Sequence, residues 1–314
     1  MGDIEFSHIS VLAGPCIEAL NVRPDGAYID ATTGGGGHSL LIAERLGPGG
    51  RLFCFDRDQE ALDAARKRLA GHLEKVVFIQ SNFARMAQAL AELSAPRPDG
   101  ILFDLGVSSY QLDNSRRGFS YKTDAPLDMR MDRGQALTAR EVVNEYSQQR
   151  LRQLLWEYGE ERYSGRVAAA IVRRREERPI ETTLELAEII RGALPPQALR
   201  EKQHPAKRSF QAIRIEVNGE LQAVEQALND GLGLLNPGGR AAVISFHSLE
   251  DRIVKRVFAQ QAKGCVCPPE FPVCVCGRKP QIKLLHKGVI LPDKEEMEQN
   301  PRARSAKLRA AEKL

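Results

Sequence analysis

Short apolar runs alternate with amphipathic segments over the first hundred residues of the chain. The apolar runs are rich in β-branched and aromatic side chains, which is typical of buried strands. The four predicted strands are 27–30, 51–56, 76–79 and 100–104. Apolar residues recur at helical spacing between them, and the three predicted helices are 40–46, 59–69 and 86–93. Strands that alternate with helices predict a mainly parallel sheet covered on both faces, which is an α/β fold.

The alternation stops after Gly106 and returns near Phe210. Between about 113 and 204 the chain has turn residues and helical segments, with no convincing strand. Two of these helices begin with a capping-box pattern, a threonine followed three residues later by a glutamate, at Thr138 and Thr182. We therefore predict an all-helical insertion that splits one α/β domain.

The α/β pattern resumes in the last third of the chain. It predicts a helix over 220–235, a fifth strand over 240–246 and a further helix with Ser248 as its N-cap and Asp251 three residues on. The last fifteen residues read as a basic tail. The predicted divisions are the first part of the core at 1–112, the helical insertion for substrate recognition at 113–205, and the second part of the core at 206–314.

A glycine loop, Thr-Thr-Gly-Gly-Gly-Gly-His at 32–38, connects the first predicted strand to a helix. The nicotinamide pattern G-x-G-x-x-G lacks its third glycine here, and no Walker lysine follows, so a P-loop is excluded. A nucleoside ligand without phosphates fits better, and S-adenosylmethionine suits the neighbouring residues. Asp56 can bind its ribose, and Phe83 can flank its adenine. The positively charged sulfonium is compatible with the nearby carboxylates of Asp30 and Asp104. The alternative is a flexible turn beside solvated carboxylates.

Composition restricts the class of protein. The chain has 314 residues with 42% apolar and 27% charged side chains, as ordinary globular proteins do. No run approaches the roughly 18 to 20 apolar residues of a membrane span, and the first residues lack a signal-peptide pattern, so we expect a cytoplasmic protein with no membrane partner. The 45 Lys and Arg against 41 Asp and Glu permit a nucleic-acid partner without requiring one.

Four cysteines gather in a loop at 265–276, as Cys265, Cys267, Cys274 and Cys276. Four thiolates can bind Zn²⁺ tetrahedrally, but most zinc sites use C-x₂-C or wider spacing rather than C-x-C. We therefore predict no metal ligand, with Zn²⁺ at this cluster as the alternative. In a reducing cytosol a disulfide within either pair is disfavoured.

A series of ordered motifs resembles those of one family, the bacterial 16S rRNA (cytosine N4)-methyltransferases, or ribosomal RNA small subunit methyltransferase H. The resemblance covers nearly the whole chain. Beyond the glycine loop, its motifs are DLGVSS at 104–109, RGFS at 117–120, PLDMRMD at 126–132, YGEER at 158–162, HPA at 204–206, FQA at 210–212, SFHSLEDR at 245–252 and NPRARS at 300–305.

The resemblance implies a class I S-adenosylmethionine-dependent methyltransferase fold, Rossmann-like with a mainly parallel sheet, carrying a helical insertion. It implies methylation of the exocyclic N4 of a decoding-centre (P-site) cytidine in 16S rRNA of the small ribosomal subunit. The residues implied to contact the methyl donor are Gly36, Gly37, His38, Asp56, Phe83, Asp104 and Gln111.

Methyl transfer to an amine needs a donor and an acceptor held in line and close together. We hypothesise that Asp104 is the catalytic residue and orients the target amine or the donor, with Ser108, Ser109 and 245–247 lining the pocket. His247 is a candidate proton acceptor, against the alternative of a helix-entry residue hydrogen-bonded to backbone.

Basic residues are expected to hold the RNA while the target base leaves its stack. The candidates are Arg166, Arg173, Arg174, Arg175, Arg178, Lys202, Lys207, Arg208, Arg214 and the basic tail. Each cluster is also compatible with a solvated helix face. Two other functions stay open, a non-catalytic ribosome assembly factor and a methyltransferase for a non-RNA acceptor. The sequence is compatible with a monomer or a homodimer.

Overall fold

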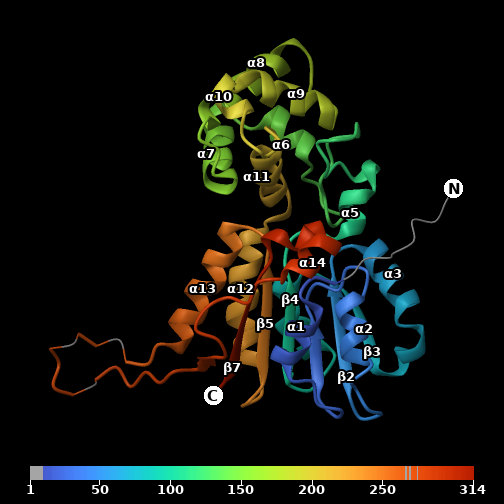
Figure 1. The fold of residues 1–314 in the computed structure, drawn as a ribbon, viewed down its shortest axis with the longest axis vertical. Coiled ribbons are helices and arrows are strands. Elements are labelled where there is room, and N and C mark those ends of the chain that lie inside the picture. The colour runs from blue at the N-terminus through green and yellow to red at the C-terminus, as the bar shows by residue number, and fades with distance from the viewer. Residues whose placement is uncertain (1–9, 266, 269, 274) are drawn as a thin grey trace. The chain divides into compact units, whose positions relative to one another are not determined.

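The computed structural model describes residues 10–314, except 266, 269 and 274 and the side chain of Ser109 (Figure 1). The chain forms two compact units. One comprises the residues up to Gly106 together with Leu221–Leu314, and the other is Val107–Glu220. The second unit starts six residues before the expected insertion and ends fifteen residues after it. Residues 206–220 thus belong to the helical unit rather than to the second part of the core.

The first unit is built on a seven-stranded sheet with the order β3-β2-β1-β4-β5-β7-β6. Strands β1 to β5 are parallel to one another, and β7 runs antiparallel to both of its neighbours. The strands are β1 Ala27–Asp30, β2 Arg51–Asp56, β3 Val76–Gln80, β4 Gly100–Asp104, β5 Arg240–Ser245, β6 Ile282–Leu284 and β7 Lys307–Lys313. The prediction of a mainly parallel sheet is confirmed, and all five predicted strands are present.

Helices cover both faces of this sheet (Figure 1). Successive strand residues point to opposite faces, so Tyr28 packs in one apolar core and Ile29 in the other. The first core includes α1 Ala13–Leu20, α2 Gly37–Ala43 and α3 Gln59–Arg68, and the second includes α4 Met86–Glu92, α12 Glu220–Leu234 and α13 Ser248–Ala262. The remaining elements are η1 Ala70–Lys75, η2 Phe83–Arg85, α14 Lys294–Gln299 and η4 Pro301–Ser305.

The prediction of a basic tail over the last fifteen residues is wrong, because the second half of that segment forms the strand β7 inside the sheet. The partners of β7 on β5 run from Arg240↔Glu312 to Ser245↔Lys307. Leu308 and the alanines of β7 are buried, while Arg309 Nε donates to Asp251 Oδ1 at 2.7 Å. Lys307 Nζ lies 3.5 Å from the same carboxylate. These two cations pair with a carboxylate of α13 and stabilise the strand against that helix, so they are not RNA-binding residues.

The predicted cap of α13 is also wrong, by one residue. His247 is the N-cap, and its Nδ1 accepts the N–H of Glu250 at 3.4 Å. The Glu250 carboxylate accepts the N–H groups of Phe246 and His247, at 2.8 and 3.3 Å. Asp251, the expected partner of a Ser248 cap, instead binds Arg309.

The second unit is helical, as predicted. Its elements are α5 Ser109–Asp113, η3 Ser115–Arg117, α6 Ala139–Glu145, α7 Gln148–Gly159, α8 Ser164–Glu177, α9 Thr183–Ala193, α10 Pro196–Leu199 and α11 Lys207–Asn218. The capping box at Thr138 is confirmed. Thr182 caps α9 through the N–H of Glu185, but the Glu185 carboxylate accepts the N–H of Glu181 and pairs with Arg174. Among the described residues of this unit, the one β-type pairing is an isolated bridge between Pro126 and Thr182.

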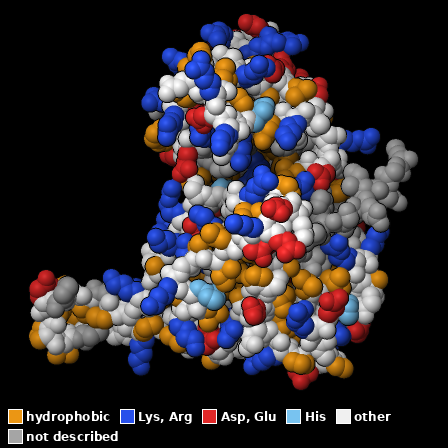
Figure 2. Space-filling view, viewed as in Figure 1, with side chains coloured by type: hydrophobic (Ala, Val, Ile, Leu, Met, Phe, Trp, Pro, Cys, Tyr) orange, Lys and Arg blue, Asp and Glu red, His pale blue; other side chains and the backbone are white. Residues whose placement is uncertain are grey.

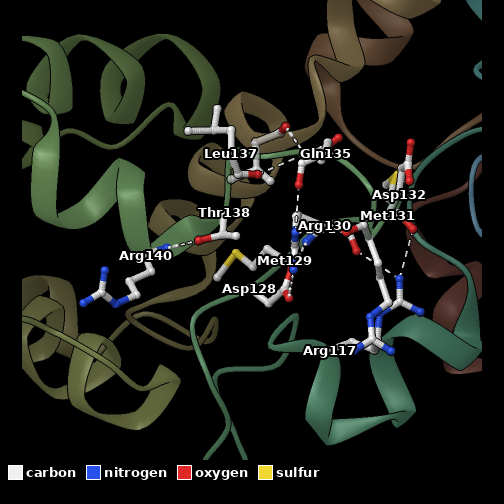
Figure 3. Close-up of polar contacts among 12 residues, drawn as sticks. Arg117, Asp128, Met129, Arg130, Met131, Asp132, Gln135, Leu137, Thr138 and Arg140 are labelled. Atoms are coloured by element: carbon white, nitrogen blue, oxygen red, sulfur yellow. Dashed lines mark hydrogen bonds and ion pairs between the residues drawn. The ribbon is translucent and has the colours of Figure 1, made fainter.

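An irregular segment of the helical unit carries two of the family-like motifs. The buried Arg117 donates through Nη2 to the carbonyl oxygens of Arg130 and Met131, at 2.9 and 3.0 Å (Figure 3). Arg130 forms a two-point ion pair with Asp128, and Asn218 accepts the N–H of Met131. A buried guanidinium that bonds main-chain carbonyls fixes a loop without regular hydrogen bonding. These motif residues therefore have a structural role in shaping the unit.

None of the helices in the described part of the chain has the length and apolar character that crossing a bilayer requires.

Candidate active site

Three carboxyl side chains stand at the carboxyl ends of adjacent parallel strands. Asp30, Asp56 and Asp104 close β1, β2 and β4, so the sheet topology brings all three to one edge. Burial raises the pKa of Asp30 and of Asp56 to about 6. Burial also raises the pKa of Asp104 to about 8, with repulsion from Asp30 and Glu250 adding to the shift. Such a cluster disfavours full ionisation unless a cation is bound beside it.

The glycine loop is attached to all three strand ends. Thr32 N–H donates to Asp30 Oδ1 at 3.1 Å, and Gly34 N–H donates to Asp56 Oδ2 at 2.8 Å. Ser39 Oγ, in the first turn of α2, donates to Asp30 Oδ2 at 2.6 Å. Thr32 Oγ1 accepts the N–H of Asp104 at 2.6 Å. These bonds hold the loop in one conformation, so it is not the flexible turn of the alternative hypothesis.

The second half of the loop passes close to its neighbours. Gly36, the N-cap of α2, has a φ of 77°, in the left-handed region that favours glycine. A Cβ there would lie 3.0 Å from Cα and Cβ of Ala65, and a Cβ on Gly37 would lie 2.1 Å from Ser10 Oγ. Glycine at both positions therefore lets the start of α2 approach Ala65 and Ser10 without a clash.

His38 is buried and faces Asp104. Its Nε2 lies 3.0 Å from the carbonyl oxygen of Val11, which only accepts, so Nε2 carries the hydrogen. Burial lowers the pKa of His38 to about 4, so the ring is neutral near pH 7. Its Nδ1 lies 3.5 Å from Asp104 Oδ2. With its hydrogen on Nε2, neutral His38 presents the Nδ1 lone pair to Asp104, so Nδ1 can accept a hydrogen bond only from the protonated carboxyl. The raised pKa of Asp104 favours that protonated form near pH 7 in the ligand-free protein.

The other oxygen of Asp104 is available to a ligand. Asp104 Oδ1 is buried and has no hydrogen-bond partner in the described part of the chain. A buried carboxylate oxygen without a partner loses its hydration and gains nothing in return. A bound ligand with a polar hydrogen or a positive charge would remove that cost.

Phe83 lies at the end of β3, as expected. It begins η2, and Asn82 caps this turn by accepting the N–H of Ala84 at 3.0 Å. The Phe83 ring packs edge-on against Phe103, with the ring centroids 6.0 Å apart. The contact fixes a half-buried aromatic ring one strand away from Asp56.

Gln111 and the serines of 108–109 belong to the helical unit, so the structure describes them separately from the strand-end acids. Gln111 is buried and forms a capping box with Ser108: its Oε1 accepts the Ser108 N–H at 3.1 Å. Ser109 was expected to line the pocket, but its side chain lies outside the described residues.

Glu250 is a site residue that the sequence reasoning missed. Its carboxylate is buried, raises the pKa of Asp104, and would lie 4.0 Å from a Cβ on Gly106. The sequence feature that could have revealed Glu250 is its position three residues after His247, which is the spacing of a capping box. The Nδ1 of His247 accepts a hydrogen bond from a backbone N–H. This favours His247 as a helix-entry residue over His247 as the proton acceptor.

The basic candidates in the helical unit fall into two groups. Arg174, Arg178, Arg208 and Arg214 pair with glutamates, and Arg175 donates to the carbonyl oxygen of Val143. Arg166, Arg173, Lys202 and Lys207 are exposed. Figure 2 shows many Lys and Arg side chains on the visible face of this unit. Exposed cations can bind RNA phosphates without first breaking an internal ion pair.

Comparisons with known proteins show the family of this chain. The model of the MraW methylase family matches residues 5–314. The chain is 51% identical to ribosomal RNA small subunit methyltransferase H of Brevibacillus brevis, over the full length of both proteins. It is 51% identical to the protein of that name from Finegoldia magna and 53% identical to that from Clostridium botulinum strain Kyoto, each over 99% of this chain and 100% of the relative.

These similarities extend over the glycine loop, the helical unit and β7 alike. They confirm the resemblance drawn from the motifs, together with the expected Rossmann-like methyltransferase fold and its helical insertion. The chain belongs to the MraW methylase family.

Proposed function

We propose that this chain transfers a methyl group from S-adenosylmethionine to the exocyclic N4 of a decoding-centre (P-site) cytidine in 16S rRNA. The observation that carries the proposal is the group of strand-end carboxyls around the glycine loop, whose raised pKa values fit a cationic ligand. The full-length relatives, named as small-subunit rRNA methyltransferases, supply the substrate class.

The residues present fit the methyl donor. Gly36, Gly37 and His38 would face it from the start of α2, Asp56 would accept from its ribose hydroxyls, and Phe83 would flank its adenine. Gln111 is proposed as a further contact on the basis of the family resemblance alone. The bound donor supplies an electrophilic methyl group on a positively charged sulfur, and the nearby carboxyls stabilise that charge.

Asp104 is proposed to orient the acceptor. The N4 of cytosine is a poor nucleophile, because its lone pair is delocalised into the ring. The unpartnered Oδ1 of Asp104 can accept a hydrogen bond from the amine and hold it for attack out of the base plane. Since transfer is an in-line displacement, positioning of this kind supplies most of the acceleration.

The helical unit is proposed to hold the RNA. The target base must leave its stack, and the flanking backbone must be bound while it does so. The exposed cations Arg166, Arg173, Lys202 and Lys207 can neutralise phosphates there. The shape of the assembled small subunit, rather than a short sequence, is then expected to set specificity. The two alternatives, a non-catalytic assembly factor and an enzyme for a non-RNA acceptor, lack a comparable observation in their favour.

The test is transfer of a labelled methyl group to small ribosomal subunits from cells that lack this protein. We expect label in the RNA and salt-sensitive binding of the chain to the subunit. Binding without label would favour the assembly factor. Label on a small molecule or protein, with none on RNA, would favour the other alternative.

Replacement of Asp56 by asparagine is expected to weaken donor binding by about 10- to 100-fold, the range for loss of hydrogen bonds to a charged group. Turnover at saturating donor should change much less. Because burial raises the pKa of Asp56 to about 6, the wild-type affinity should fall as the pH drops below about 6 and the carboxyl gains a proton. Titration calorimetry between pH 5 and pH 8 measures both effects.

The matched control is Asp63→Asn, an exposed aspartate on α3. Its donor affinity should equal that of the wild type at each pH. If Asp56→Asn bound the donor as tightly as this control, Asp56 would not be a ribose ligand.

A further inference from the structure

The loop between α13 and β6 extends away from the sheet (Figure 1). Its two ends are held together beside the end of α13. Gln281 N–H donates to the carbonyl oxygen of Gln261 at 2.8 Å, and Arg278 Nη2 donates to that of Gln260 at 2.6 Å. The base of the loop is therefore fixed by hydrogen bonds to the last turn of the helix.

The outer part of the loop buries little apolar surface. Phe271, Val273 and Val275 are 51%, 70% and 74% exposed. A segment that buries so little apolar surface gains little stabilisation from the hydrophobic effect. Some other interaction is needed to keep such a loop in one conformation.

Three thiols of this loop converge. The Sγ atoms of Cys265, Cys267 and Cys276 all lie within 4.8 Å of one another. Sγ of Cys265 and Sγ of Cys276 are 3.7 Å apart. That separation exceeds the roughly 2.05 Å of a disulfide bond, so these two cysteines are not joined to each other by a disulfide. It matches the edge of about 3.8 Å of a tetrahedron whose four sulfurs lie about 2.3 Å from a central zinc ion.

The backbone around these thiols suits thiolate ligands. Cys267 N–H donates to Cys265 Sγ at 3.4 Å, and a donor to sulfur favours its charged form. The thiols are exposed or half-buried, so an ion can reach them from solvent.

We propose that Cys265, Cys267 and Cys276 bind a zinc ion, which closes the loop. In the sequence, the C-x-C spacing of the four cysteines argued against a metal. The fold changes this, because it brings a thiol from the second pair to within a tetrahedron edge of one from the first. Cys274 lies outside the described residues, so the proposal rests on three thiols. It is independent of the proposed methyl transfer, which does not use this loop.

The test uses the full chain, purified under argon with reductant, incubated with ZnCl₂ and dialysed. We expect about one zinc ion per chain by elemental mass spectrometry, as for other structural thiolate sites. Cys265→Ser and Cys276→Ser should each lose most of it, whereas Val275→Ser, an exposed neighbour with no ligand atom, should retain it. Substitution with Co²⁺ should give thiolate-to-cobalt charge-transfer absorption in the wild type and the Val275 variant only. Thermal unfolding of each variant checks that it is folded.

The zinc content should also fall on acidification, because protons compete with the metal for the sulfurs. Wild-type protein that holds no zinc after this treatment would overturn the proposal. So would cysteine variants that retain as much zinc as Val275→Ser, or a Cys265–Cys276 disulfide found in place of the bound ion.

Discussion

Replacement of Asp104 by alanine is expected to lower the rate of methyl transfer at saturating donor by about 10²- to 10³-fold, the usual cost of removing one preorganised group that acts on the reacting atoms. The reason is the unpartnered Oδ1, which is the group best placed to accept from the target amine. Donor binding should persist, because Asp56 and the glycine loop remain. Single-turnover transfer and donor titration measure the two effects separately.

Asp104→Asn provides the matched control, since it keeps the shape and one acceptor oxygen but removes the charge. Its turnover should lie between those of the wild type and the alanine variant. Loss of donor binding in both variants would reduce Asp104 to a donor ligand, and unchanged turnover in both would remove it from the mechanism.

Asp104→Asn should also change the free energy of unfolding, in a direction set by the pKa of Asp104. Asp104 has a raised pKa of about 8 in the folded chain, so the folded state disfavours its ionised form. This carboxyl therefore destabilises the ligand-free protein increasingly as the pH rises from about 4 toward 8. Asp104→Asn should raise the free energy of unfolding at pH 8 by ~1–3 kcal/mol, with little effect near pH 4.

Replacement of Gly36 by alanine is expected to destabilise the protein by ~1–3 kcal/mol and to reduce donor affinity by at least about tenfold. The residue has a φ of 77°, and the new Cβ would lie 3.0 Å from the backbone of Ala65 in α3. Backbone cannot move aside as a flexible side chain can. The loop would have to shift, together with the N–H groups that face the donor. Denaturant unfolding and donor titration measure both effects.

Gly71→Ala is the matched control for this substitution, because no atom lies within 4 Å of the added Cβ and its φ is not left-handed. It should change neither stability nor donor affinity appreciably. A Gly36 variant that behaved like the Gly71 variant would show that the loop adapts without cost, and that its shape does not determine donor binding.

The sequence pattern predicted the parallel part of the sheet because those strands read as continuous apolar runs, and all but the half-buried β3 are buried on both faces. It missed β7 for the opposite reason. That strand, KLRAAEK, has one leucine and two alanines between charged residues, too few for an apolar run. It is partly buried because β5 and β6 flank it and Asp251 pairs with its cations. The short helix α1 was not predicted either. Such cases depend on tertiary partners that local periodicity does not reveal.

The candidate site was predictable where it follows from strand ends. Asp30, Asp56 and Asp104 each close a parallel strand, and topology alone gathers them at one edge. Glu250 was missed because its role depends on a helix cap placed one residue earlier than the sequence suggested. The pairing of basic residues such as Arg214 with Glu220 could not be predicted, since it depends on side-chain geometry around a helix end.

Nucleoside analysis of the methylated RNA tests the central claim most directly. Small subunits from cells lacking this protein are incubated with the purified chain and labelled S-adenosylmethionine, and the digested 16S rRNA is analysed by mass spectrometry. The account predicts N4-methylcytidine at one decoding-centre position, and none with Asp104→Ala. A label on another atom or base, or no label despite measurable donor binding, would contradict it.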